Sequence, residues 1–177
     1  MDKKSNWVDL KQIIRDFSDF PKPGILFRDI TPIMQSPEYY KSAVHQIEEK
    51  LADIEFDIVI APESRGFMFG APVAYSMGKG FVPARKKGKL PGERLTKTYF
   101  LEYGLEAIEI HKDAIKPGQK VAIVDDLLAT GGTAKGICDI VEELGGEVTA
   151  IVFLINLNFP KGKEVLEGYN VQTIIEY

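Results

Sequence analysis

The chain has 177 residues, of which 45% are hydrophobic and 27% charged, and its formal net charge at pH 7 is −4. This length suits a single domain with a full core, and the acidic balance argues against a general nucleic-acid binder. No apolar run approaches the roughly 20 residues that span a bilayer, the charged first residues carry no apolar export signal, and the one cysteine fits a reducing compartment. We therefore expect a cytoplasmic protein without membrane or nucleic-acid partners.

The first third of the chain predicts two helices separated by an extended segment. An apolar face that begins at Trp7 predicts a helix over residues 6–17. Three prolines and a glycine make DFPKPGILFRDITP (residues 19–32) a rigid, extended segment. Pro37 is the expected first residue of a second helix, which ends near Leu51.

Strands alternate with helices from residue 56 onward. Strands are predicted at FDIVIAPE (56–63), FVPAR (81–85), KVAIVDD (120–126), EVTAIVFLIN (147–156) and VQTIIEY (171–177), with helices after the first and third. TKTYFLEYGLEAIEIH (96–111) alternates weakly around a glycine and predicts a hairpin or a long mobile excursion. The order is that of an α/β domain with a central, mostly parallel sheet flanked by helices. Ligands of such sheets bind at the carboxyl ends of the strands.

A glycine turn with hydroxyls follows one of these strands, in VDDLLATGGT (124–133). Gly131 and Gly132 let the backbone approach a ligand closely, and the helix that begins there adds free N–H donors and a positive dipole end. Thr130 and Thr133 add hydroxyl donors. The turn lacks the lysine of a P-loop and the spacing of a dinucleotide fold. It predicts a phosphate site, and a plain strand-to-helix turn is the alternative.

Two adjacent acids, Asp125 and Asp126, stand between that strand and the turn. Unpaired charge at the end of a buried strand is costly to desolvate, so these carboxylates need partners. The vicinal hydroxyls of a ribose are suitable donors, whereas a solvated strand end is the bland alternative. Acids and turn together predict a ligand with the hydroxyls of ribose at one end and a 5-phosphate at the other.

Four apolar residues, two acids and LLATGGT resemble the phosphoribosyl-diphosphate signature of the type I phosphoribosyltransferases. PGILFRDITP, APESRGF, RKKGKLPGE and LEYG then make the chain similar to the adenine-specific branch of that family over residues 20–163. The resemblance implies one domain over residues 1–177, with an N-terminal hood over about 18–36 and a mobile catalytic loop over about 94–110. It implies that adenine and 5-phosphoribosyl 1-diphosphate (PRPP) yield AMP and diphosphate. It also implies Mg²⁺, held through PRPP and water, and a homodimer.

The resemblance also assigns roles to site residues. The ribose 5-phosphate half falls to Asp125, Asp126, Ala129, Thr130, Gly131, Gly132 and Thr133. The diphosphate half falls to Ser64, Arg65, Arg85 and Lys89, and adenine to Ile25, Leu26, Phe27, Arg28 and Phe159. Glu102 matches the acid that handles the purine proton, and Tyr103 a residue that closes the loop. Each assignment has a structural alternative. Arg65 could form a surface ion pair with Glu63, and the lysines of residues 86–89 a solvated charge run. Glu102 could face solvent, and the apolar hood residues could be ordinary core.

Other functions stay open at this point. A regulator that binds PRPP without turnover shares the acid and glycine signature, although the chain shows neither an added nucleic-acid domain nor a large basic face. A sister transferase would use another nucleobase. Ala129 stands where hypoxanthine-guanine relatives commonly carry an aspartate, and this favours adenine. Cys138 is expected to be a core residue, and His45 and His111 show no metal-ligand spacing.

Overall fold

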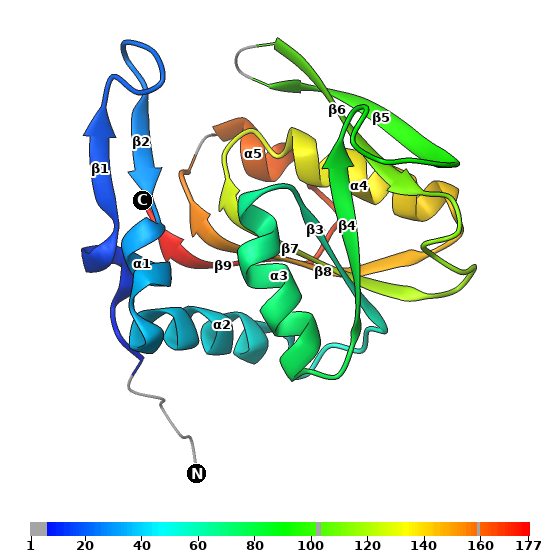
Figure 1. The fold of residues 1–177 in the computed structure, drawn as a ribbon, viewed down its shortest axis with the longest axis horizontal. Helices are drawn as coiled ribbons and strands as arrows, with labels where there is room; N and C mark the ends of the chain where they lie inside the picture. The colour runs from blue at the N-terminus through cyan, green and yellow to red at the C-terminus, as the bar shows by residue number, and fades with distance from the viewer. Residues whose placement is uncertain (1–6, 102–103, 159) are drawn as a thin grey trace. The chain divides into compact units, whose positions relative to one another are not determined.

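The computed structural model describes residues 7–101, 104–158 and 160–177. The chain divides into two compact units, Met1–Gln46 and Ile47–Tyr177 (Figure 1). The first unit holds a 3-10 helix η1 (Leu10–Ile13), strands β1 (Arg15–Ser18) and β2 (Leu26–Asp29), and helix α1 (Thr31–Gln35). Helix α2 (Pro37–Leu51) begins in the first unit and ends in the second, with the bounds that the sequence predicts.

The first unit contains a two-stranded antiparallel sheet where the sequence predicts a helix over residues 6–17. That prediction is wrong, because Asp9 caps only a single 3-10 turn, accepting the amide of Lys11 at 3.1 Å. From Arg15 onward the chain pairs with β2, and Arg15 Nε donates to Asp29 Oδ2 at 3.0 Å across the strands. Cross-strand contacts of this kind override the helical spacing of the apolar residues.

The second unit is built on a seven-stranded sheet in the order β5-β6-β4-β3-β7-β8-β9. Its strands are β3 (Ile58–Pro62), β4 (Gly80–Lys86), β5 (Arg94–Leu101), β6 (Gly104–His111), β7 (Lys120–Leu128), β8 (Glu147–Asn156) and β9 (Val171–Glu176). The five strands from β4 to β9 in this order are parallel, and the β5–β6 hairpin joins the β4 edge in antiparallel pairing. The predicted mostly parallel sheet is confirmed, and β5 and β6 pair as the strands of a hairpin.

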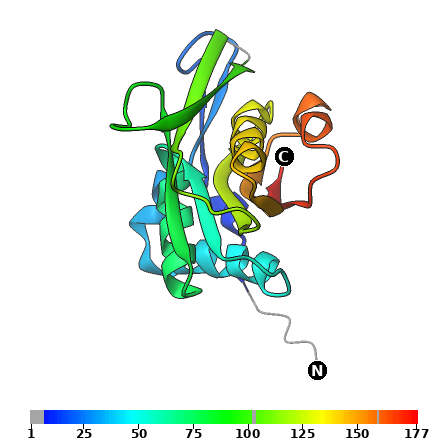
Figure 2. The ribbon, with the colours of Figure 1, turned by 90° about the vertical axis from the view of Figure 1, so that its right-hand side faces the viewer.

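Three helices belong wholly to this unit: α3 (Arg65–Ser76), α4 (Gly132–Glu143) and α5 (Pro160–Val165). The connection β3–α3–β4 crosses the sheet in one direction, and β7–α4–β8 crosses it in the other. Because both crossovers are right-handed, α3 and α4 cover opposite faces, as Figure 2 shows. The short helix α5 is absent from the sequence prediction.

The core of the second unit lies between the central strands and α4. The β7 residues from Val121 to Val124 and the β8 residues from Ala150 to Ile155 are at most 1% exposed. Such continuous burial is expected of parallel strands covered on both faces. Cys138 is part of this core, as predicted, and burial raises the pKa of its thiol to about 12. Within the described ranges, no helix is both long and apolar enough to cross a membrane.

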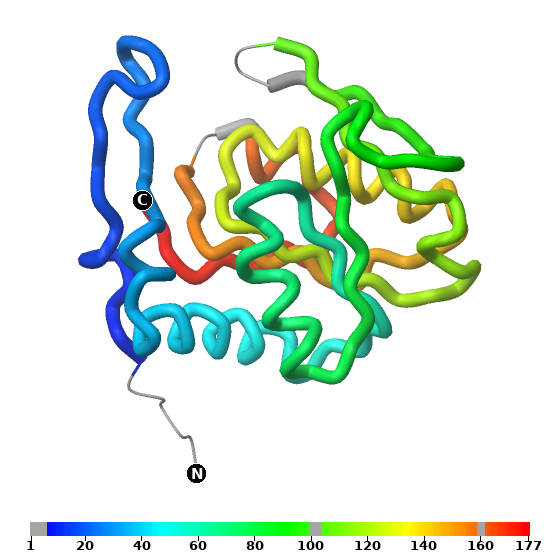
Figure 3. The backbone as a smooth tube through the Cα atoms, viewed as in Figure 1, coloured from blue at the N-terminus to red at the C-terminus, as the bar shows by residue number. Residues whose placement is uncertain are grey.

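The topology of the sheet fixes where a ligand binds. β3 and β7 are neighbours, and the chain leaves them toward opposite edges, as its path in Figure 3 shows. A crevice opens outside the carboxyl ends of two such strands. The chain carries residues 63–66 directly after β3 and Asp125 to Thr133 along the end of β7. The segment that contains Ser64 and Arg65 and the segment that contains the paired acids and the phosphate loop therefore meet at the switch point of the sheet.

Candidate active site

Asp125 and Asp126 are buried, with exposed fractions of 9% and 5%. Asp125 Oδ1 accepts the amide of Asp126 at 2.8 Å. Burial raises the pKa of both carboxyls, and the adjacent charge of Asp126 raises that of Asp125 further. Among the described residues, Oδ2 of Asp126 is the buried side-chain polar atom that lacks a hydrogen bond. An acceptor in this state suits a hydroxyl donor supplied by a ligand.

Arg65 is the first residue of α3 and reaches the same carboxylate. Its Nε lies 2.9 Å from Asp126 Oδ2, and its side chain is 34% exposed. Ser64, exposed at the N-cap of α3, makes no side-chain hydrogen bond to the helix, and the Glu63–Ser64 peptide bond is cis. The structure thus brings one predicted diphosphate residue, Arg65, against one predicted ribose residue, Asp126.

Two further predicted cations, Arg85 and Lys89, meet at Glu63. Arg85 Nε donates to Glu63 Oε2 at 2.6 Å, and Lys89 Nζ lies 3.6 Å from Oε1. Burial raises the pKa of Glu63, but these cations and the amide of Lys86 outweigh it and hold the pKa below its ordinary value. Arg65, Arg85 and Lys89 therefore all belong to ion pairs at the carboxyl ends of the parallel strands.

The predicted phosphate loop, residues 129–133, runs from β7 into α4. Gly131 adopts φ +76° and ψ −7°, a left-handed conformation that favours glycine, and α4 begins at Gly132 without a side-chain cap. The first amides of an α-helix have no partner within the helix, so they remain donors for an anion. Thr133 lies by the β5–β6 hairpin, because its side chain forms a hydrogen bond with Tyr99 of β5. Burial raises the pKa of Tyr99 above its ordinary value, and this hydrogen bond offsets only part of the rise.

Gly162 of α5 packs against this loop at a distance that excludes a side chain. A Cβ atom on Gly162 would lie 2.1 Å from the carbonyl oxygen of Ala129, and one on Gly131 would lie 2.6 Å from the carbonyl oxygen of Gly162. Both obstacles are backbone atoms, which cannot rotate away. This close contact sets the distance between the phosphate loop and α5.

For the reaction that the resemblance implies, we expect Gly162→Ala to raise the KM for PRPP about five- to tenfold, an effect near 1–1.4 kcal/mol, because the methyl group displaces the phosphate loop. Steady-state kinetics at saturating adenine measure this. Gly146→Ala is the matched control, because its Cβ would lie 2.8 Å from Ile115 Cγ2, outside the site. Both variants should unfold at lower temperature. An unchanged KM in Gly162→Ala would show that the loop tolerates displacement.

The remaining predicted site residues are not joined to this site by the structure. Ile25 to Arg28 belong to the first unit. There Leu26 is 44% exposed, the rings of Phe20 and Phe27 meet edge to face at 5.2 Å, and Arg28 pairs with Asp16. Glu102, Tyr103 and Phe159 lie outside the described residues. The roles of all these residues in binding adenine or in catalysis stay predictions.

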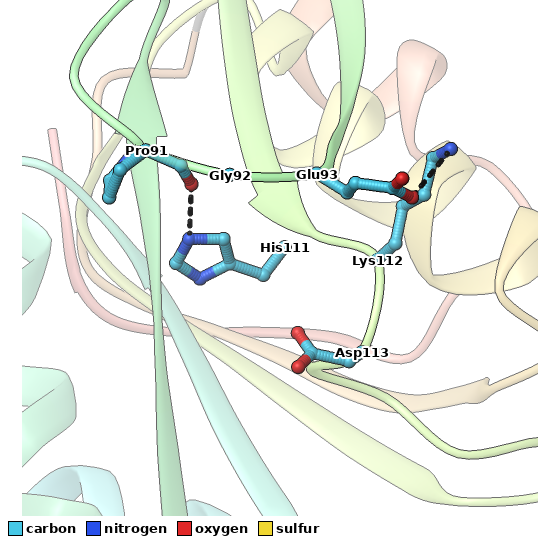
Figure 4. A pocket seen from close by; sticks show the side chains of 6 residues that line it. All are labelled: Pro91, Gly92, Glu93, His111, Lys112 and Asp113. Atoms are coloured by element: carbon cyan, nitrogen blue, oxygen red, sulfur yellow. Dashed lines mark hydrogen bonds and ion pairs between the residues drawn. The ribbon is translucent and has the colours of Figure 1, made fainter.

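A pocket of about 460 Å³ lies at the base of the β5–β6 hairpin and is lined by Pro91, Gly92, Glu93, His111, Lys112 and Asp113 (Figure 4). His111 Nε2 lies 2.9 Å from the carbonyl oxygen of Pro91. None of the predicted site residues lines this pocket.

His45 stacks on Trp7 with 5.7 Å between the ring centres. Within the described part of the chain, no group of three or more His, Cys, Asp and Glu side chains is placed to hold a metal ion.

Sequence reasoning missed two residues of this site. The sequence places Glu63 in the segment that follows a buried strand but gives it no role beyond a surface ion pair with Arg65, although an acid at such a position is a signal for a functional contact. Gly162 gave no signal, because its importance depends on a contact with Ala129, 33 positions earlier in the chain. Such a contact becomes visible only when the packing of α5 against the phosphate loop is known.

Comparison with known proteins identifies the family. Residues 30–175 match the model of the phosphoribosyl transferase domain. The chain is 55% identical to an adenine phosphoribosyltransferase of Alkaliphilus metalliredigens over 170 residues, which are 96% of this chain and 100% of the relative.

Two solved structures are also similar. The adenine phosphoribosyltransferase of Thermoanaerobacter pseudethanolicus matches with a TM-score of 0.93 and 49% identity, covering 95% of this chain and 98% of that one. The enzyme of Saccharomyces cerevisiae, solved with adenine and an imino-altritol bisphosphate, matches with a TM-score of 0.87 and 40% identity, covering 93% and 96%. With its parallel sheet, paired acids and phosphate loop, the chain belongs to the type I phosphoribosyltransferases and, within them, to the adenine phosphoribosyltransferases.

Proposed function

We infer that the protein is a pentosyltransferase of purine salvage that converts adenine and PRPP into AMP and diphosphate. The bond between C1 of the ribose and the diphosphate oxygen breaks, and a bond from C1 to a ring nitrogen of adenine forms. The observation that carries this inference is the juxtaposition of two buried acids, Asp125 and Asp126, with Arg65 on one side and the phosphate loop on the other. These groups match the hydroxyl, diphosphate and 5-phosphate parts of PRPP.

The acids and the loop bind the half of PRPP that does not leave. In the proposed complex the ribose hydroxyls donate to Asp125 and Asp126, which fills the missing hydrogen bond at Asp126 Oδ2. The 5-phosphate accepts the amides of residues 130–133 and the hydroxyls of Thr130 and Thr133. Holding the sugar at both ends fixes C1 in place, so that binding energy is used for orientation.

The cations bind the half that leaves. As the bond from C1 breaks, negative charge grows on the diphosphate and positive charge on the sugar ring. Arg65, Arg85 and Lys89, with the amides around Ser64, are placed to stabilise the leaving group electrostatically. In the proposed complex the carboxylates of Asp125 and Asp126 lie at the ribose hydroxyls, where their negative charge favours the positive charge on the ring.

Mg²⁺ fits this site as a companion of the substrate. When bound, it would neutralise part of the diphosphate charge, because Mg²⁺ prefers phosphate oxygens and water to a cage of protein ligands. The acids of the site agree with this, because Asp126 Oδ2 already faces a cation, Arg65 Nε, at 2.9 Å. The ion would therefore contact the protein through PRPP and water.

The other parts of the proposal rest on the family. The hood residues Ile25 to Arg28 and Phe159 would enclose adenine, Glu102 would handle the proton on the ring, and Tyr103 would help to close the loop. Closure would exclude water, which competes for the activated sugar. We also propose a homodimer that acts in the cytoplasm.

Product formation tests the function directly. The protein is incubated with PRPP and Mg²⁺ and, separately, with adenine, hypoxanthine, guanine, xanthine or uracil, and the nucleotides are resolved by chromatography. We expect AMP from adenine, no nucleotide from the other bases, and loss of activity when EDTA removes Mg²⁺. Another nucleotide would overturn the base specificity. PRPP binding without any product would favour a regulator.

A further inference from the structure

Glu63 directly follows β3 and precedes Ser64 and Arg65. Its amide donates to the carbonyl oxygen of Ala84 at 2.9 Å, which extends the pairing of β3 with β4 by one residue. Its side chain is only 7% exposed. The carboxylate is therefore fixed at the carboxyl ends of these two strands, where β4 continues into the basic segment (residues 85–89).

Both carboxylate oxygens of Glu63 are engaged by this basic segment. Oε2 accepts Arg85 Nε at 2.6 Å. Oε1 accepts the amide of Lys86 at 2.9 Å, and the ammonium of Lys89 lies 3.6 Å from the same oxygen. Since the net effect of these groups is to lower the pKa of Glu63 despite its burial, the carboxylate is ionised at neutral pH.

The two cations are held with different strength. Arg85 makes a short, charge-assisted hydrogen bond through Nε, and this fixes the plane of its guanidinium. A guanidinium bound in this way has four more N–H donors on its terminal nitrogens, in a fork that matches phosphate oxygens. Lys89 is 57% exposed, lies at the limit of ion pairing and has a flexible stem, so a more highly charged anion can take it from Glu63.

We propose that Glu63 is a positioning residue for the diphosphate half of the substrate. It orients the guanidinium of Arg85 and keeps Lys89 within reach until diphosphate replaces Glu63 as the partner of this lysine. The inference rests on the proposed function, in which Arg85 and Lys89 bind diphosphate. Arg65 offers a parallel, because its Nε lies at Asp126, so that both arginines of the site are held through Nε by carboxylates that are 7% exposed or less.

Removal of the Glu63 charge changes the affinity for diphosphate in two opposing ways. A carboxylate beside an anion site repels the anion, and its removal alone would strengthen binding. The charge of Glu63 is, however, already matched by two cations and an amide, so the remaining repulsion is small. Loss of the orientation of Arg85 weakens a bidentate contact, and we expect this loss to dominate.

Calorimetric titration with magnesium diphosphate, and separately with AMP, tests the proposal on Glu63→Gln, which keeps the shape of the side chain and removes its charge. We expect the Kd for diphosphate to rise about tenfold, while the Kd for AMP stays within about twofold because its phosphate binds residues 129–133. Glu63→Asp keeps the charge and should recover part of the diphosphate affinity. Thermal unfolding confirms that each variant is folded.

Glu109→Gln is the matched control. Glu109 is 2% exposed and accepts the amide of Gly88 at 2.9 Å, so it anchors the backbone of the same basic segment from β6. We expect this variant to keep the wild-type ratio of the two Kd values. Equal or tighter diphosphate binding by Glu63→Gln, or an equal loss in Glu109→Gln, would overturn the proposal. Failure of the wild type to form AMP would instead refute the proposed function.

Discussion

Arg65→Ala should lower kcat/KM for PRPP at least about a hundredfold, an effect near 2.7 kcal/mol. Two losses combine in this variant. Arg65 supplies a cation to the leaving diphosphate, and it is the cation that lies 2.9 Å from the buried Asp126 carboxylate. Without Arg65 that carboxylate keeps its burial but loses its counter-charge, and this is costly. Steady-state kinetics with PRPP varied at saturating adenine measure the first loss, and thermal unfolding measures the second.

Arg94→Ala separates these two losses. Arg94 is 38% exposed, close to the 34% of Arg65, and its Nε lies 3.3 Å from Glu109, a carboxylate that is 2% exposed. The control therefore also removes a partly exposed arginine from a buried acid, but at the first residue of β5, where its partner is Glu109 and not an acid of the predicted ribose site. We expect a loss of stability with kcat/KM within about twofold of wild type. Equal kinetic losses in the two variants would mean that Arg65 acts only by stabilising the fold.

The sequence predicts those parts of the fold in which local pattern and environment agree. The buried runs of β3, β7 and β8 are apolar because helices cover both faces of the sheet, and the acids and glycines that interrupt the pattern mark the strand ends. The helix predicted over residues 6–17 is wrong for the complementary reason. Its apolar spacing is helical, but the pairing of Arg15–Ser18 with β2 depends on residues 8 to 14 positions away.

The site shows the same division between local and distant information. The sequence places Asp125, Asp126 and the phosphate loop together, because they are adjacent in the chain. It also places Arg65 at the end of a neighbouring strand. The sequence does not show which acid pairs with which arginine. The pairing of Arg65 with Asp126, and of Arg85 with Glu63, depends on strand register and on the rotamers of long side chains. Partner choice is therefore the information that the structure adds to the motifs.

Asp125→Asn should lower kcat/KM for PRPP at least about thirtyfold, near 2 kcal/mol, and at the same time raise the stability of the free protein at pH 7. The activity falls because a neutral amide accepts a ribose hydroxyl more weakly than a carboxylate and does not favour positive charge on the sugar. The stability rises because burial and the charge of Asp126 both oppose ionisation of Asp125, and asparagine removes that cost while its oxygen can still accept the amide of Asp126.

The ionisation of Asp125 makes the free energy of unfolding depend on pH. The folded-state pKa of Asp125 lies above the ordinary value of 3.8, so the folded protein binds a proton that the unfolded chain has already released. The free energy of unfolding therefore falls as the pH rises from 3.8 through the folded-state pKa. Thermal unfolding from pH 4 to 8 should show a smaller fall in Asp125→Asn than in wild type, with a melting temperature roughly 2–4 °C higher at pH 7 for a gain of 1 kcal/mol.

Asp113→Asn, which neutralises an exposed acid in the same unit, should change neither stability nor kcat/KM. A melting temperature of Asp125→Asn below that of wild type would mean that the folded protein uses the charge of Asp125 even without ligand. The expected opposite outcome has a physical consequence for the site. Two carboxylates are kept adjacent and buried at a cost in stability that a ribose diol would offset, so the free protein holds this part of the site ready for the sugar.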